Sequence, residues 1–122
     1  MAEEVPGHYQ TLVTATSDGL TTGLIPGDAQ FVTVTSANAD YIVTLPAGYI
    51  GQIIRGRVGA NGCELRTIAS SGDTINNVDS DGTQEAAIPT TVTFMAQKVT
   101  ATGWILMTWT ALGAVATAIV PD

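Results

Sequence analysis

Residues 40–59, DYIVTLPAGYIGQIIRGRVG, constrain the fold of this chain more than any other stretch. Residues 41–45 alternate with a period of two, which is the period at which β-strand side chains change faces. Pro46 and Gly48 then interrupt the strand, because proline lacks an N–H and glycine tolerates unusual backbone dihedral angles. A second β-rich run follows at residues 52–58. The stretch therefore predicts two strands joined by a hairpin-like corner, around which the other strands pack.

Short runs of β-favouring residues recur along the rest of the chain. The expected strands are residues 11–16, 30–35, 41–45, 52–58, 63–69, 83–88, 91–100 and 104–111. On the strand at residues 91–100, we expect Phe94 and Ala96 on one face and Met95 on the other. No window keeps the i, i+3, i+4, i+7 apolar spacing of an amphipathic helix over several turns.

Turn residues separate these runs. Asn61-Gly62 supplies the two positive φ angles that a type I′ turn requires, so we predict a hairpin there. Residues 70–82 are rich in Ser, Gly, Asp and Asn and are expected to form a loop. Together these features predict one all-β domain over residues 1–122. We expect an antiparallel, jelly-roll-like β-sandwich of about seven or eight strands at residues 11–111, with an N-terminal arm at 1–10 and a C-terminal tail at 112–122.

The charge content is low and acidic. Only 12% of the residues are charged, whereas about 25% is usual for a globular domain. A monomer would have to cover its surface with small polar and apolar side chains, so we infer that another protein covers much of this surface. The net charge of −7 argues against nucleic acid and anionic membranes as partners, because their binding proteins carry basic patches.

Residues 104–120 form a mostly apolar run that resembles a membrane anchor in composition. The run is short of the ~20 apolar residues of a spanning helix, contains threonines and is broken by Gly113. Its first half also alternates, so we predict a buried strand followed by a docked tail. No secretory signal is visible at the N-terminus, and the lone Cys63 excludes an intrachain disulfide.

No catalytic constellation is recognisable. The chain has one histidine, His8, and one cysteine, Cys63, and their spacing suggests no nucleophile–base pair. The carboxylates Asp73 and Asp79 lie in a turn-rich segment, where Asp usually serves turn geometry. We therefore predict that the protein is not an enzyme and has no cofactor and no small-molecule substrate.

Residues 77–82 carry the best local motif for a metal. Asn77, Asp79 and Asp81 occupy positions 1, 3 and 5 of a calcium-loop pattern, with Gly82 at position 6. Position 12 is Ile88 instead of the bidentate glutamate, and no flanking helices are predicted. The alternative interpretation is a connection between strands that is rich in Asx turns. These three side chains are the candidate metal ligands, and no metal is otherwise predicted.

The aromatic residues admit two interpretations. Tyr41, Tyr49, Trp104 and Trp109 could form a sugar-binding platform, but core aromatics are the commoner case. Trp104 and Trp109 are an odd number of residues apart, so on one regular strand they face opposite ways. One of them is expected in the core and the other at an interface.

The order of four short motifs resembles a module of tailed-bacteriophage virion proteins. In that module a Leu-Pro corner precedes a Gly-Gln-x-Ile strand, an Asp-Thr-Ile-Asn loop follows, and a Gly-Trp-x-Leu strand closes the sheet. The matching residues here are Leu45, Pro46, Gly51, Gln52, Ile53, Asp73, Thr74, Ile75, Asn76, Gly103 and Trp104. The similarity spans roughly residues 38–110 and looks like the small β-sandwich of head decoration (cement) proteins and of some fibre domains. The corner residues Leu45, Pro46 and Gly51, together with Trp104, are expected to define the fold.

The resemblance implies a structural role on the virion. Proteins of this kind sit as trimers on the outer capsid surface after synthesis in the host cytoplasm, and their arms clamp the major capsid protein. The arm residues expected to make such contacts are Glu3, Glu4, Val5, Pro6, His8, Tyr9, Leu112, Val115, Ile119 and Val120. Two alternatives stay open: a tail-fibre or receptor-binding domain that recognises glycans, and a calcium-dependent binding module.

Overall fold

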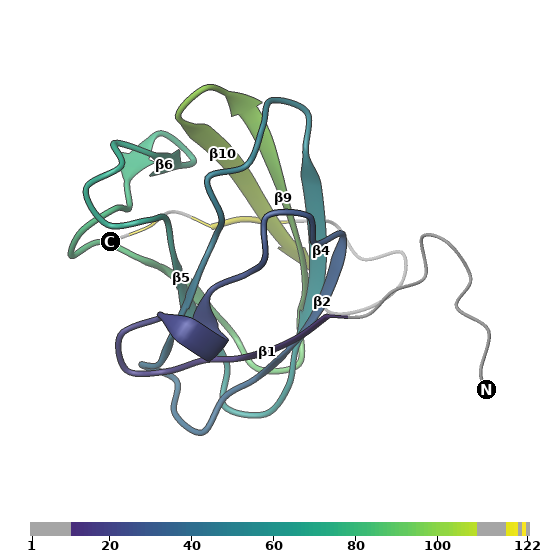
Figure 1. The fold of residues 1–122 in the computed structure, drawn as a ribbon. Coiled ribbons are helices and arrows are strands. Elements are labelled where there is room, and N and C mark those ends of the chain that lie inside the picture. Colours follow the sequence, from purple (N-terminus) through teal and green to yellow (C-terminus); the bar gives the residue numbers. More distant parts are fainter. Residues whose placement is uncertain (1–10, 110–116, 120, 122) are drawn as a thin grey trace.

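The computed structural model describes residues 11–109, 117–119 and 121, and these residues form an almost entirely β structure with two sheets (Figure 1). The larger sheet contains β1 (Thr11–Thr14), β2 (Phe31–Thr35), β4 (Ile53–Val58), β6 (Thr74–Ile75), β7 (Val78–Asp79), β9 (Thr93–Thr100), β10 (Gly103–Trp109) and β11 (Thr117–Ala118). The smaller sheet contains β3 (Ile42–Thr44), β5 (Cys63–Arg66) and β8 (Ala86–Ile88). A short 3-10 turn, η1 (Thr21–Gly23), is the helical element of the described part. The all-β prediction is confirmed.

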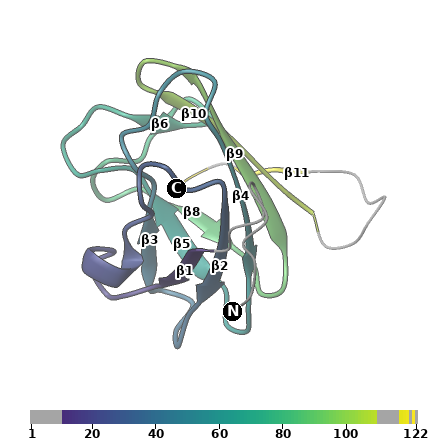
Figure 2. The same ribbon diagram turned by 45° about the vertical axis from the view of Figure 1, so that its right-hand side comes forward.

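Strand order explains how the sheets are connected. The large sheet runs β1-β2-β4-β9-β10-β6-β7, with β11 also paired to β10, and the small sheet runs β3-β5-β8 (Figure 2). The expected purely antiparallel pairing is wrong, because β1–β2, β2–β4, β3–β5 and β6–β10 are parallel. The cause is that the chain leaves β2, passes through β3 in the other sheet, and returns as β4 beside β2. A crossover of this kind brings the two strands back in the same direction.

The corner and the Asn61-Gly62 turn, which were expected to form hairpins, instead carry the chain from one sheet to the other. The corner at residues 45–52 joins β3 of the small sheet to β4 of the large sheet, and residues 59–62 return it to β5. Asn61 and Gly62 do adopt positive φ angles, 79° and 69°, as the sequence predicts. The hairpin prediction at this turn is nevertheless wrong, since β4 and β5 do not pair.

A hairpin does form within the segment expected to be a loop. β6 and β7 pair antiparallel with Ile75 opposite Val78, so Asn76 and Asn77 are the two central turn residues. Their φ angles are 51° and 68°, the left-handed values of a type I′ turn, which asparagine tolerates better than most residues. This short hairpin adds β6 and β7 to the strands expected from the sequence.

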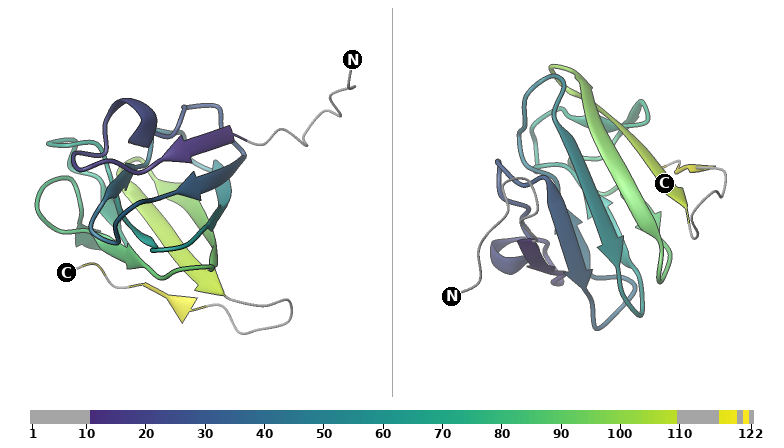
Figure 3. Two further views of the ribbon diagram at one scale, coloured as in Figure 1. Left: turned by 90° about the horizontal axis from the view of Figure 1, so that it is seen from below. Right: turned by 90° about the vertical axis from the view of Figure 1, so that its right-hand side faces the viewer.

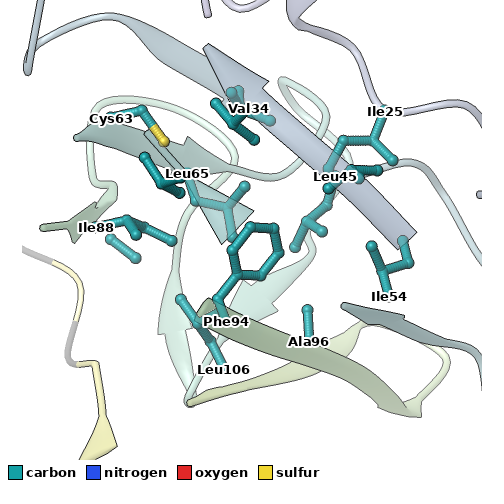
Figure 4. Close-up of a cluster of buried hydrophobic side chains, with 14 of the residues drawn as sticks. Ile25, Val34, Leu45, Ile54, Cys63, Leu65, Ile88, Phe94, Ala96 and Leu106 are labelled. Carbon is teal, nitrogen blue, oxygen red and sulfur yellow. The ribbon is translucent and has the colours of Figure 1, made fainter. Parts of the chain in front are cut away.

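Side chains from both sheets meet in one apolar core, where the ring of Phe94 lies centrally (Figure 4). The fully buried core residues include Ile54, Phe94 and Leu106 from the large sheet and Val43 and Leu65 from the small sheet. The alternation predicted for residues 91–100 is confirmed. Phe94 and Ala96 are buried, whereas Met95 is partly exposed on the opposite face.

Candidate functional site

Lys98 lies at the centre of a buried polar cluster beneath the corner. Its Nζ is 3.7 Å from Oδ2 of Asp73, and it donates a hydrogen bond to the carbonyl oxygen of Ala47. The same ammonium lies 5.7 Å from the ring centroid of Trp104, within the range of a cation–π contact. Lys98, Asp73 and Trp104 are all buried. The ammonium group of Lys98 thus contacts three segments: the corner, the segment before β6 and the first residues of β10.

Gln52 and Gly48 complete this cluster. The side-chain amide of Gln52 donates to the carbonyl oxygen of Gly27 at 2.9 Å, and its backbone carbonyl accepts from Lys98 N–H at 2.9 Å. A Cβ at Gly48 would lie 2.8 Å from both Gln52 Oε1 and the Trp104 ring, and its φ is +70°. Position 48 therefore has no space for a side chain. Among the described residues, neither Gln52 Oε1 nor Trp104 Nε1 has a hydrogen-bond partner.

The side chain of Asn76 extends the framework to the C-terminal segment. Its amide pairs with the backbone of Leu106 like a neighbouring strand: Leu106 N–H donates to Oδ1 at 3.0 Å, and Nδ2 donates to the Leu106 carbonyl at 3.0 Å. The same Nδ2 donates to the carbonyl of Ile119. One asparagine thus links the β6–β7 turn, β10 and the segment after β11.

The residues that carry the resemblance to phage virion proteins therefore come together in space. Leu45 and Pro46 are buried at the corner, Gln52 and Trp104 are in the cluster, and Asp73 is its anion. Gly51 has a φ of +95° and is held by a hydrogen bond from its N–H to the Lys98 carbonyl. This arrangement is a buried framework and not an open binding site.

The three candidate calcium ligands lie on the β6–β7 hairpin and just after it. Asn77 is a turn residue, and Asp81 N–H donates to Asp79 Oδ1 at 3.3 Å, which is Asx-turn geometry. A hydrogen bond between the two carboxyl groups raises the pKa of Asp79 and lowers that of Asp81, and the Gly72 N–H lowers the latter further. Asp81 Oδ2 accepts that Gly72 N–H at 2.5 Å. In the described part of the chain, no group of three or more His, Cys, Asp or Glu side chains could hold a metal ion.

A second group of acidic side chains lies on the small sheet. Glu64 of β5 is partly buried, and burial, a hydrogen bond to Glu85 and the charges of Glu85 and Asp40 raise its pKa to about 7, while Arg66 opposes the shift. Arg66 is also 3.4 Å from Glu85, and it donates to the Gly82 carbonyl at 2.6 Å. The sequence does not reveal this group, because Asp40 and Glu85 become neighbours of Glu64 only when β3 and β8 pair with β5.

The outward side of the large sheet carries a row of apolar and cationic side chains. In register across β2, β4, β9 and β10, this row is Phe31, Arg55, Met95 and Met107. The next row includes Leu12, Arg57 and Trp109. We call the surface formed by these two rows, together with the row of Ile53, Gln97 and Ile105, the outer sheet face. The strands β2, β4 and β9 lie side by side across it in the right-hand view of Figure 3.

The four aromatic residues do not form one platform. Trp104 is completely buried and Trp109 is partly exposed on the outer sheet face, so the prediction that they face opposite ways is confirmed. Tyr41 packs against the core, whereas Tyr49 is 65% exposed at the corner. Tyr49 and Trp109 are far apart, because the corner adjoins Lys98 at one end of β9 and Trp109 pairs with Thr93 at the other.

Most of the expected arm contacts lie outside the described residues, namely Glu3, Glu4, Val5, Pro6, His8, Tyr9, Leu112, Val115 and Val120. Ile119 is described, and it is partly buried against the core of its own chain.

Cys63 is buried, and this burial, followed by the charge of Glu64, raises the pKa of its thiol to about 12. This thiol is therefore poorly suited to nucleophilic chemistry.

No protein-family model, curated protein or solved structure matches this chain. Among the described residues, no helix is long and apolar enough to cross a membrane.

Proposed function

We propose that this chain is a head decoration (cement) protein of a tailed bacteriophage. It binds the outer capsid surface and stabilises the shell through trimeric, multivalent contacts with the major capsid protein. Its partners are that protein and further copies of itself, with no nucleic acid, membrane or small-molecule substrate. It acts by contact and not by catalysis, and it needs no cofactor.

The observation that carries this proposal is the convergence of the resemblance motifs on one buried cluster. The Leu-Pro corner, Gln52, Asp73, Asn76 and Trp104 belong to separate segments, yet they share contacts through Lys98, Gly48 and the start of β10. The motifs are thus parts of one structural unit, as a shared module requires. Two sheets around a shared core also suit the jelly-roll-like sandwich that we assign to the family.

Multivalency supplies the physical mechanism. A single small patch binds weakly, but a trimer that engages several shell subunits at once gains avidity without new contacts. The low charge content fits a chain with much of its surface covered in the assembled particle.

The proposal is tested on heads of a phage that encodes this chain but is purified without it. We expect purified protein to bind such heads and to raise the temperature at which they rupture. Light scattering of the free protein should give the mass of three 12.6-kDa chains. Heads that lack the protein and still resist heat and osmotic shock as well as complete heads would refute the proposal.

The exposed corner favours a second candidate, a fibre or receptor-binding domain that recognises glycans. Tyr49 and Ile50 are 65% and 63% exposed side by side, and an exposed aromatic residue can stack on a sugar ring. Purified protein should then bind host cells, and Tyr49→Ala should abolish that binding. Absence of binding to host cells and isolated surface glycans would remove this candidate.

A further inference from the structure

We infer that the outer sheet face docks onto a second protein whose surface is apolar at its centre and carries carboxylates opposite Arg55 and Arg57. The inference rests on the proposed function, in which that protein is the phage shell, and it names the surface and the chemistry through which the contact is made.

The composition of the face is that of an interface centre. Phe31, Met95, Met107 and Trp109 lie on it at least partly exposed, and Leu12 is 76% exposed at its edge. Aromatic residues, methionine and arginine are the types enriched at protein interfaces, whereas acidic residues are depleted there. Strands of an antiparallel or mixed sheet that face water normally present polar side chains outward, so this face departs from that pattern.

The charge of the face is opposite to that of the whole chain. None of the strands β1, β2, β4, β9 and β10 contains Asp or Glu, although the chain has a net charge of −7. Arg55 and Arg57 are both exposed, and they lie about 6.6 Å apart along β4, the spacing of alternate residues in a strand. Within the described part of the chain, neither guanidinium has an ion-pair partner. Two arginines in an apolar surround, without an ion-pair partner among the described residues, select carboxylates at matching positions.

The same charges disfavour other occupants. A second copy bound face to face would bring its arginines toward these, and like charges in an interface oppose association. Nucleic acid and anionic membranes require a larger basic footprint and would be repelled by the remaining acidic surface. A protein surface with carboxylates is the occupant that both the apolar rows and the arginines fit.

The test uses purified full-length protein and phage heads that lack it as the probe. In one variant, Arg55→Gln and Arg57→Gln are combined. The matched control combines Thr83→Glu and Gln84→Glu, which lie exposed in the loop before β8. Both double variants lower the net charge by the same amount, two units below the −7 of the wild type. A difference in binding between them therefore reports where the charge was changed and not how much. Circular dichroism and melting curves check that all three proteins are folded.

We expect the arginine variant to bind heads about tenfold or more weakly than the wild type, and the control to bind nearly as well. On bound wild-type protein, Met95 and Met107 should be protected from peroxide oxidation. If wild type and arginine variant bind equally and both methionines stay reactive, this inference is wrong while the proposed function stands. If the wild type does not bind, both fail. A change in the mass of the free protein caused by the arginine substitutions would instead assign the face to self-association and overturn the inference.

Discussion

The ring of Phe94 occupies the space in which a side chain at position 56 would lie. A Cβ at Gly56 would be 2.4 Å from both Cε1 and Cζ of that ring and 2.7 Å from Cγ2 of Val32. Gly56 and Phe94 are direct partners on β4 and β9, so the ring folds across its neighbour's backbone into the core. Glycine at this position is what allows the largest apolar side chain of β9 to pack there.

We therefore expect Gly56→Ala to destabilise the protein by about 1–3 kcal/mol, the usual cost of overpacking a core. Gly27→Ala is the control, because nothing lies within 4 Å of a Cβ there, and its effect should stay within about 0.5 kcal/mol. Urea denaturation at a fixed temperature measures both. Equal effects of the two substitutions would contradict the packing argument.

The buried ion pair between Lys98 and Asp73 predicts a strongly non-additive mutant cycle. Removing either charge alone leaves the other buried without its counter-ion, which typically costs about 3–5 kcal/mol. Lys98→Met and Asp73→Asn should each be severely destabilising, whereas the double variant should be more stable than the sum of the two losses predicts. Thermal melts of the four proteins give the coupling energy. Additive losses would mean that the two side chains act independently.

The sequence predicts those features of the fold that depend on neighbouring residues, and it does not predict contacts between segments far apart in the chain. Alternation is local, so it correctly placed Phe94 and Met95 on opposite faces of one strand. The dihedral angles of Asn61-Gly62 are local too, but the partners of the flanking strands depend on packing of the whole chain, and the expected hairpin does not form. The Lys98–Asp73 pair joins distant segments and has no spacing by which it could be recognised.

The outer sheet face could be predicted from the sequence only in part. Arg55 and Arg57 alternate with buried residues of β4, and this alternation is visible in the sequence. What the sequence does not reveal is that Phe31, Met95 and Met107 align with Arg55 across three neighbouring strands, because strand order sets that register.

Glu64 predicts a pH dependence of stability. Its ordinary pKa of 4.5 is raised to about 7 in the folded protein, so the folded state binds more protons than the unfolded state between these values. The stability that the protonated group provides is present in full below pH 4.5 and is lost as the pH rises through 7. Glu64→Gln removes this loss. It should therefore stabilise the protein at pH 8 by about 1 kcal/mol, discounted for solvent screening of this partly exposed group.

Melting curves of wild type and Glu64→Gln from pH 4 to pH 8 measure this effect, and the difference between them should vanish near pH 4. Asp40→Asn is the companion variant, since the charge of Asp40 contributes a smaller part of the shift. It should give a weaker change in the same direction. A difference that stays constant across the pH range would exclude titration of Glu64 as its cause.

Alanine substitutions at Asn76 and Asn77 form a matched pair that measures how much the side-chain amide of Asn76 contributes to the stability of the fold. Both adopt left-handed backbone angles, 51° and 68°, so alanine at either position meets a similar backbone cost. Only Asn76 uses its side chain to pair with the backbone of Leu106 and to bind the Ile119 carbonyl. Asn76→Ala should therefore exceed Asn77→Ala in destabilisation by about 1–3 kcal/mol, because it leaves buried backbone groups unpaired. Hydrogen exchange should locate the loss. The Leu106 amide donates to Asn76 Oδ1, and the Ile119 amide donates to the Leu106 carbonyl that Asn76 also binds. Both amides should lose protection in Asn76→Ala and keep it in Asn77→Ala, whereas equal protection in both variants would show that the C-terminal segment is held without Asn76.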